Sequence, residues 1–236
     1  MKAVREWLRN ASSIAVLTGA GVSAESGVPT FRGNNGLWKQ YRADELATPG
    51  AFARDPKLVW EWYDWRRSVI AQAKPNPGHY ALVEAEERAH KFTLITQNVD
   101  GLHELAGSRN VLRLHGSIWM LRCLECKRER EDRRSPLPEL PPRCECGGML
   151  RPGVVWFGEA LPRKVWRDAE AAARSADLFL LIGTSAVVYP AAGLAPIAKT
   201  AGARVVEINV AETGLSGGID EFLKGPSGEL LPQLMA

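Results

Sequence analysis

Residues 19–32 have the sequence Gly-Ala-Gly-Val-Ser-Ala-Glu-Ser-Gly-Val-Pro-Thr-Phe-Arg and directly follow the short apolar run Ile14-Ala-Val-Leu17. The apolar run is typical of a buried strand in a parallel sheet. Gly19, Gly21 and Ala24 then fit the G-x-G-x-x-G/A pattern of dinucleotide-binding turns, where glycine lets the backbone approach a pyrophosphate and a helix N-terminus supplies free N–H donors. Glycine-rich turns also join strands to helices without binding anything, so the pattern needs support from elsewhere. Side chains suited to phosphate and ribose follow it: Ser23, Ser26, Thr30 and Arg32.

The composition is that of a globular protein with one large domain, or with one domain and a small insertion. The net charge of +3 across 236 residues is compatible with a basic protein substrate or a nucleic acid and favours neither. Arg5, Glu6 and Arg9 interrupt the N-terminal segment, which therefore does not resemble a signal peptide. The uncharged segment 178–198 contains glycines and prolines that would break a spanning helix. We expect a soluble, cytoplasmic protein that does not bind membranes.

Apolar runs alternate with segments of helical periodicity along most of the chain. Strands are predicted over 13–18, 92–96, 111–114, 154–157, 178–182 and 205–208, and helices over 2–10, 57–72, 79–89, 102–105, 162–174, 190–201 and 228–235. Residues 37–49 are predicted to form a loop with one helical turn. This alternation predicts an α/β fold, a Rossmann-like doubly wound parallel sheet, in which polar residues just past the strand ends form the binding site.

Four cysteines gather in one 24-residue window, with the pattern C-x2-C, seventeen residues, then C-x-C; they are Cys123, Cys126, Cys144 and Cys146. The spacing is close to that of a four-cysteine zinc ribbon, although the second pair is one residue shorter than usual. Two disulfides or four buried reduced thiols are the alternatives, and a zinc ribbon can also serve as a nucleic-acid module. Four thiolates would close the zinc coordination shell, so the metal would be structural.

Among the four histidines, one is a candidate for catalysis. His79, His90 and His103 lie on or beside predicted helices among charged residues, and we expect them at the surface. His115 instead ends a buried strand and should lie near residues 97–100, which end the neighbouring strand. Its near-neutral pKa suits a general base.

Several motifs together resemble the sirtuin family of NAD-dependent protein-lysine deacylases, over essentially the whole chain. They are residues 19–32, Thr96-Gln-Asn-Val-Asp-Gly-Leu-His103, His115-Gly116, the cysteine module, Val154-Val-Trp-Phe-Gly-Glu159 and Gly183-Thr-Ser185. The resemblance implies an enzyme that transfers an acyl group to ADP-ribose and releases nicotinamide, O-acyl-ADP-ribose and free lysine. It also implies NAD, consumed as a co-substrate, and one structural zinc ion.

The resemblance implies roles for individual residues. His115 would activate a ribose hydroxyl, Asn98 would orient the ribose and a water, and Asp100 would hold the nicotinamide amide. The implied NAD contacts are Gly19, Ala20, Gly21, Ala24, Phe31, Arg32, Gln97, Asn98, Asp100, Gly183, Thr184, Ser185, Asn209 and Ser227.

A possible acyl-selecting pair lies on the predicted helix 57–72. Tyr63 and Arg66 are three residues apart and share one helix face, where a phenol and a guanidinium would bind a carboxylate. Tyr-x-x-Arg, together with the small residue Ala47, resembles the class III subfamily of bacteria and archaea that removes succinyl, malonyl and glutaryl groups. The alternative is that both side chains only pack or form ion pairs on an exposed helix. Removal of acetyl groups can coexist with this specificity.

The resemblance also implies that the substrate peptide adds as a strand beside residues 155–158 and 186–188, with Val155, Phe157 and Gly158 in contact with it. Backbone pairing tolerates many side chains, so the sequence preference should be weak. The expected partners are acyl-lysine proteins, with basic chromatin proteins and metabolic proteins as candidates, and no sequence-specific binding of nucleic acid is expected.

We expect two domains. Residues 1–36, 89–119 and 151–236 would form the NAD-binding Rossmann-like domain, and the helical insertion 37–88 would combine with the zinc module 120–150. A mono-ADP-ribosyltransferase and an NAD-binding or zinc-ribbon scaffold with little turnover are the alternative functions. A dehydrogenase is disfavoured because the acidic residue expected about 20 positions after the glycines, at the end of a second strand, is missing.

Overall fold

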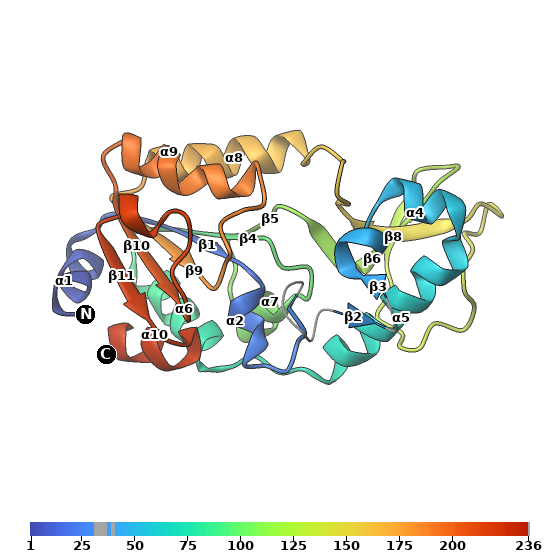
Figure 1. The fold of residues 1–236 in the computed structure, drawn as a ribbon, viewed down its shortest axis with the longest axis horizontal. Coiled ribbons are helices and arrows are strands. Elements are labelled where there is room, and N and C mark those ends of the chain that lie inside the picture. The colour runs from blue at the N-terminus through green and yellow to red at the C-terminus, as the bar shows by residue number, and fades with distance from the viewer. Residues whose placement is uncertain (31–36, 39–40, 236) are drawn as a thin grey trace.

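The structure is a computed structural model that describes residues 1–30, 37–38 and 41–235. Two predicted NAD contacts, Phe31 and Arg32, lie outside the described residues. The chain forms a six-stranded, a three-stranded and a two-stranded sheet, and the two larger sheets lie toward opposite ends of the molecule (Figure 1). Within the described residues, no helix is both long and apolar enough to span a bilayer.

The six-stranded sheet is parallel throughout. Its strands lie in the order β11 (Glu221–Lys224), β10 (Arg204–Asn209), β9 (Leu178–Ile182), β1 (Ser13–Thr18), β4 (Lys91–Thr96) and β5 (Val111–Arg113). The chain extends the sheet from β1 through β4 and β5, and then on the other side of β1 through β9, β10 and β11. The Rossmann-like, doubly wound prediction is therefore confirmed, and the order reverses between β1 and β9, where such sheets bind ligands.

Helices cover both faces of this sheet, because alternate residues of each strand point to opposite faces. Ile14 and Val16 of β1 join one core cluster, and Ala15 and Leu17 join the other. The first cluster includes residues of α1 (Lys2–Asn10), α6 (Pro77–Arg88) and α10 (Ser227–Met235), and the second includes residues of α8 (Arg163–Arg174) and α9 (Leu194–Thr200). Figure 1 shows α8 and α9 side by side along one face. The short helices α2 (Ala20–Ala24) and α7 (Leu102–Ala106) follow β1 and β4.

The three-stranded sheet is antiparallel, in the order β7 (Glu129–Glu131), β6 (Gly116–Cys123) and β8 (Leu150–Val154). It shares an aromatic core with α4 (Pro49–Arg54) and α5 (Pro56–Gln72). Asp55 caps α5 by accepting a hydrogen bond from the Leu58 N–H at 2.9 Å, and Pro56 is the first helical residue, as the sequence predicts. The fully buried Arg67 of α5 donates to the backbone carbonyls of Ile118 and Arg134, which ties the helix to this sheet and the loop beyond it.

In this part of the chain one sequence prediction is wrong and another is incomplete. The predicted strand 154–157 is β8, which ends at Val154, because the Trp156 and Phe157 N–H groups donate to the Glu159 side chain and the Ala47 carbonyl instead of a sheet. In the predicted loop 37–49, α3 (Ala43–Leu46) is the one helical turn that was predicted, but the short strands β2 (Leu37–Trp38) and β3 (Tyr41–Arg42) were not predicted. These strands are too short to show a period in sequence.

Candidate active site

A cleft of about 1220 Å³ lies at the carboxyl ends of β1, β4, β9 and β10 and is closed on its other side by residues of the aromatic core. Sixteen of the predicted site residues line it: Gly19, Ala20, Gly21, Ala47, Tyr63, Arg66, Gln97, Asn98, His115, Val155, Phe157, Gly158, Gly183, Thr184, Ser185 and Asn209. Residues up to 190 positions apart in the sequence thus share one wall. The cleft lies at the point where the strand order reverses.

The two glycine turns at the floor of the cleft contact each other closely. The Gly21 N–H donates to the Gly183 carbonyl at 2.7 Å. A Cβ atom at Gly21 would lie 2.7 Å from that carbonyl oxygen, and a Cβ at Gly183, where φ is +58°, would lie 2.5 Å from the Val22 nitrogen. These glycines are therefore required by the packing of β1 against β9, in addition to any role beside a phosphate.

Side-chain amides connect the strand ends along the cleft. The Gln97 Nε2 donates to the Thr184 hydroxyl at 3.0 Å, and the Asn209 Nδ2 donates to the Thr184 carbonyl at 2.8 Å. These bonds join residues that follow β4 and β9 with the last residue of β10. The wall is consequently preorganised.

Asn98 and Asp100 belong to one buried network. The Asn98 Nδ2 donates to the Gly19 carbonyl at 3.0 Å and to the Ser23 hydroxyl at 3.2 Å, and the Ser23 hydroxyl donates to the Asp100 Oδ2 at 2.8 Å. The Leu102 N–H donates to the other Asp100 oxygen. Burial raises the pKa of Asp100. Asp100 itself lies behind the cleft wall, whereas Asn98 lines it.

His115 lies between β5 and β6, beside the end of β4. Its Nδ1 is 3.0 Å from the Gln97 carbonyl oxygen, and because a carbonyl only accepts, the ring proton must lie on Nδ1. The Nε2 of the neutral imidazole then carries a lone pair. Burial lowers the pKa of His115, so the neutral form predominates at neutral pH.

Tyr63 and Arg66 do not lie on an exposed helix face, since both side chains are buried in the wall of the cleft. The Tyr63 hydroxyl accepts a hydrogen bond from the Trp156 indole N–H at 2.9 Å. Arg66 lies over the Trp62 ring, 5.3 Å from its centroid, and burial lowers the pKa of its guanidinium. Ala47 lines the same cleft.

Three predicted NAD contacts that the structure describes are not among the residues that line the cleft: Asp100, which lies behind the wall, Ala24 and Ser227. Ala24 ends α2 and is exposed to solvent. Ser227 begins α10, and its hydroxyl donates to Glu25 at 3.3 Å. The cleft wall also contains residues to which the sequence analysis gave no individual role, although Trp156 and Glu159 belong to a quoted motif: Arg42, Trp156, Glu159, Leu161, Tyr189, Ala211, Glu212 and Thr213. Residues 211–213 follow Asn209, a predicted site residue at the end of a strand. Their position just past this strand end could have predicted that they line the cleft.

The prediction that His79 and His103 lie at the surface is wrong. His79 on α6 and His103 on α7 are almost fully buried, with ring centroids 4.8 Å apart. Their helices turn these side chains toward β1, where the His103 Nε2 lies 3.0 Å from the Thr18 hydroxyl oxygen. Burial lowers the pKa of His79 to about 4 and that of His103 to about 3. His90 is exposed, as predicted.

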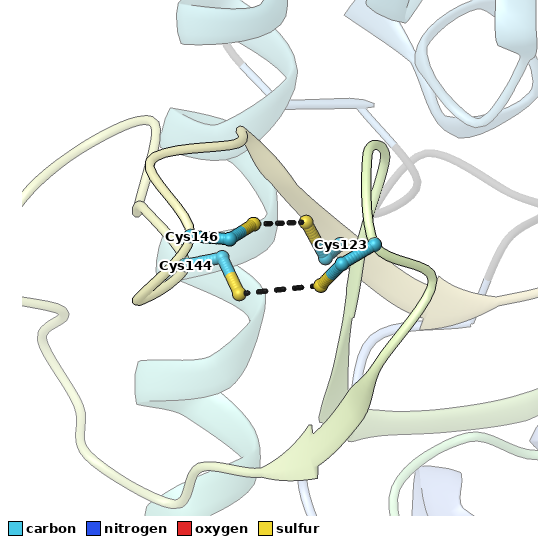
Figure 2. Close-up of side chains that lie close together, drawn as sticks. Cys123, Cys144 and Cys146 are labelled. Atoms are coloured by element: carbon cyan, nitrogen blue, oxygen red, sulfur yellow. Dashed lines mark hydrogen bonds between the residues drawn. The ribbon is translucent and has the colours of Figure 1, made fainter.

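The four cysteine sulfurs lie within 4.8 Å of one another. The Cys123 and Cys146 sulfurs are 3.5 Å apart and face each other in Figure 2, and the Cys126 and Cys144 sulfurs are 3.8 Å apart. Zinc–sulfur bonds of about 2.3 Å in a tetrahedron require sulfurs roughly 3.8 Å apart. These separations fit one zinc ion and exclude disulfides in this structure.

The surroundings of the cysteines also suit a metal. A hydrogen bond from the Arg128 guanidinium lowers the pKa of the Cys126 thiol to about 6, which favours the thiolate that binds zinc. Cys126 and Cys146 are exposed, so the alternative of four buried thiols does not hold. A Cβ atom at Gly148 would lie 2.9 Å from the Cys123 sulfur, so glycine is needed beside the site.

Comparison with known proteins gives concordant findings. The model of the Sir2 family matches residues 19–190. A protein named NAD-dependent protein deacylase from Aquifex aeolicus is 57% identical over 90% of this chain and 89% of its own, and NAD-dependent protein deacylase 2 from Pyrobaculum aerophilum is 55% identical over 98% of this chain and 93% of its own. A crystal structure of a Sir2 homolog–NAD complex superposes with a TM-score of 0.95 at 48% identity, over 100% of this chain and 92% of that one. A Sir2–p53 peptide–NAD+ structure gives a TM-score of 0.88 at 32% identity, over 100% and 97% of the two chains.

Proposed function

The chain belongs to the Sir2 family, and we propose that it is an NAD-dependent protein-lysine deacylase that transfers the acyl group to ADP-ribose. The observation that carries the proposal is His115, which lines the cleft with its proton held on Nδ1 by the Gln97 carbonyl. Bound NAD supplies the ribose carbon that receives the acyl oxygen. A mono-ADP-ribosyltransferase and a scaffold are not favoured, because the relatives are named as deacylases.

In this proposal each residue of the cleft has its own role in binding or proton transfer. The His115 Nε2 accepts a proton from a ribose hydroxyl. The Asn98 Nδ2 already donates to Gly19 and Ser23, so its Oδ1 is left to accept from a ribose hydroxyl or a water. Asp100 orders Asn98 through Ser23 from behind the wall. The glycine turns hold the phosphates.

We further propose that the acyl group is acetyl or a short dicarboxylic chain such as succinyl or malonyl. Tyr63 and Arg66 offer a phenol and a guanidinium at one buried place, and a carboxylate there would form charge-assisted hydrogen bonds in a desolvated setting. Ala47 leaves room for the longer chain. A buried cation is stabilised by an opposite charge, which favours acidic over neutral acyl groups at this position.

We propose that the substrate peptide pairs with the backbone of this chain, but through fewer backbone N–H groups than the sequence implies. The Val155 and Phe157 N–H groups already donate to the carbonyls of His115 and Ala47. Among the described residues, no hydrogen bond occupies the N–H groups of Gly158 or Val187. Together with the Val188 N–H, for which no bond is found within the described part of the chain either, these groups remain to pair with an extended acyl-lysine peptide of a basic chromatin protein or a metabolic protein.

A comparison of acetyl-, succinyl- and malonyl-lysine forms of one peptide tests this function. We expect His115→Ala to abolish turnover of all three, and Arg66→Met to lower succinyl turnover by about tenfold or more while acetyl turnover survives. Arg54→Met, at an exposed position of α4, is the control. If ADP-ribose is instead recovered stably on protein without free lysine, the chain is a mono-ADP-ribosyltransferase.

We also propose a cytoplasmic location. The cysteines form a cluster of metal-ligand geometry with no disulfide, which suits a reducing compartment. Fractionation of cells with an antibody to the chain tests this, and recovery in a secreted fraction would contradict it.

A further inference from the structure

The Tyr63 hydroxyl is prepared to act as a donor. The Trp156 indole N–H can only donate, and it lies 2.9 Å from the Tyr63 oxygen, which therefore accepts. The hydroxyl proton of Tyr63 must then point elsewhere, and no described residue accepts it. Both side chains are only 3% exposed, and Tyr63 lines the cleft. Burial also raises the pKa of Tyr63, so the phenol keeps its proton.

Trp156 is in turn held from several sides. The Arg151 guanidinium lies 3.5 Å from the Trp156 ring centroid, and the Phe52 ring packs against the same indole at 5.1 Å between centroids. Arg151 forms two hydrogen bonds with Glu159, of 2.6 and 2.9 Å. Glu159 then accepts the Trp156 backbone N–H at 2.9 Å. These contacts close a ring that fixes both the indole and its backbone.

We propose that Trp156, clamped by Arg151 and Glu159, is a positioning residue that orients the Tyr63 hydroxyl as a donor to the carboxylate of an acidic acyl group. This inference rests on the proposed function and adds the residues that set its acyl selectivity. Without the indole N–H, the Tyr63 hydroxyl would lose its preferred orientation and donate to a carboxylate for only part of the time. Neutral acetyl groups present no carboxylate and would not depend on this orientation.

A double-mutant cycle tests the inference. We expect Trp156→Phe, which keeps a ring but removes the N–H, to lower the ratio of succinyl to acetyl kcat/KM by about tenfold, the value of one hydrogen bond to a charged group. In the Tyr63→Phe background the same change should alter the ratio by less than about twofold, because the hydroxyl to be oriented is absent. Glu159→Gln, which weakens the clamp, should lower the ratio in the same direction.

Trp60→Phe is the matched control. Trp60 is fully buried beside Tyr63, with ring centroids 6.4 Å apart, and its indole donates to the Leu150 carbonyl instead. It should lower the melting temperature and leave the acyl ratio unchanged. If Trp60→Phe and Trp156→Phe lower the ratio of succinyl to acetyl kcat/KM equally, Trp156 acts only through packing and the inference is overturned.

The experiment separates this inference from the proposed function. Affinity of the succinyl-lysine peptide, measured by calorimetry without turnover, reports on Tyr63 even if catalysis fails. No turnover with any acyl group contradicts the deacylase proposal. Succinyl turnover with additive effects of Tyr63→Phe and Trp156→Phe leaves the function standing and overturns the inference. If only acetyl groups are removed and succinyl-lysine is not bound selectively, both the inference about Trp156 and the proposal of an acidic acyl substrate are overturned. The deacetylase function then still stands.

Discussion

His115 combines a fixed tautomer with a lowered pKa, and together they predict how activity depends on pH. The Gln97 carbonyl holds the Nδ1 proton, and burial lowers the pKa below its ordinary value of 6.5. A base with a lowered pKa stays neutral, and therefore active, at more acidic pH. We expect kcat/KM to decline on the acidic side with a midpoint below pH 6.5. A pH profile of the wild type measures it, and His90→Gln, at an exposed site, should not move the midpoint. A midpoint above 6.5 would mean that His115 is not the titrating base.

At the level of residues, the sequence located the half of the cleft that belongs to the parallel sheet. Gln97, His115, Thr184 and Asn209 were predictable because the carboxyl ends of parallel strands meet at one edge. Trp156 and its clamp lie in a segment after an antiparallel strand, where no such rule applies. The burial of His79 was not predictable, because the charged neighbours along its helix conceal the face turned toward the sheet.

The zinc module is an element whose stability should depend on its metal. Four sulfurs within 4.8 Å of one another hold two chain segments together beside β6 and β8. We expect one zinc per chain by elemental analysis, and none in Cys123→Ser. Removal should lower the melting temperature by roughly 10 °C, corresponding to about 4 kcal/mol for a chain of this size.

The control is return of the metal. Zinc added back after chelation should restore the melting temperature, whereas magnesium, which prefers oxygen ligands, should not. A chain that melts at the same temperature with and without chelator would show that the module folds without metal.

The long helices were predictable, but length alone did not decide the outcome, because the short β5 and α7 were predicted and the eight-residue β6 was not. Helix α5 carries an Asp-Pro start and an apolar stripe, and α8 was placed within one residue of its observed start. Strand β11 was missed because its two apolar residues, Phe222 and Leu223, stand between charged residues, and β8 contains Pro152 and Gly153, which argue against a strand in sequence. Strand β8 nevertheless pairs with both ends of β6, at Gly116 and at residues 121–123, with an irregularity between them, and both strands contribute to the aromatic core.

At the scale of the whole molecule, we propose a two-part division with boundaries adjusted to the elements. The expected boundaries at residues 119 and 151 would cut through β6 and β8. Placing them at His115 and Val155 keeps the antiparallel sheet in one unit. Helix α6 packs on the parallel sheet through Ala81 and Leu82, so it belongs with that sheet. Limited proteolysis of the two units tests this division.

The buried pair His79 and His103 predicts that the whole fold loses stability in mild acid. Unfolded histidines titrate near pH 6.5, whereas these two titrate at about 4 and about 3 in the folded chain. Between pH 6.5 and about 4 the unfolded state therefore binds more protons, and the free energy of unfolding falls as pH falls. Above pH 6.5 the two histidines are neutral in both the folded and the unfolded state, so they no longer make the free energy of unfolding depend on pH.

Each histidine should remove about 2 kcal/mol of stability between pH 7 and pH 5. Denaturant unfolding across this range avoids most carboxyl titration and measures the effect. His115, whose pKa burial also lowers, adds to the wild-type slope, so the comparison of variants isolates the pair. Whatever its stability at pH 7, the His79→Gln variant should lose about 2 kcal/mol less than the wild type between pH 7 and pH 5. An equal slope in His79→Gln and wild type would show that His79 does not stay neutral in the fold.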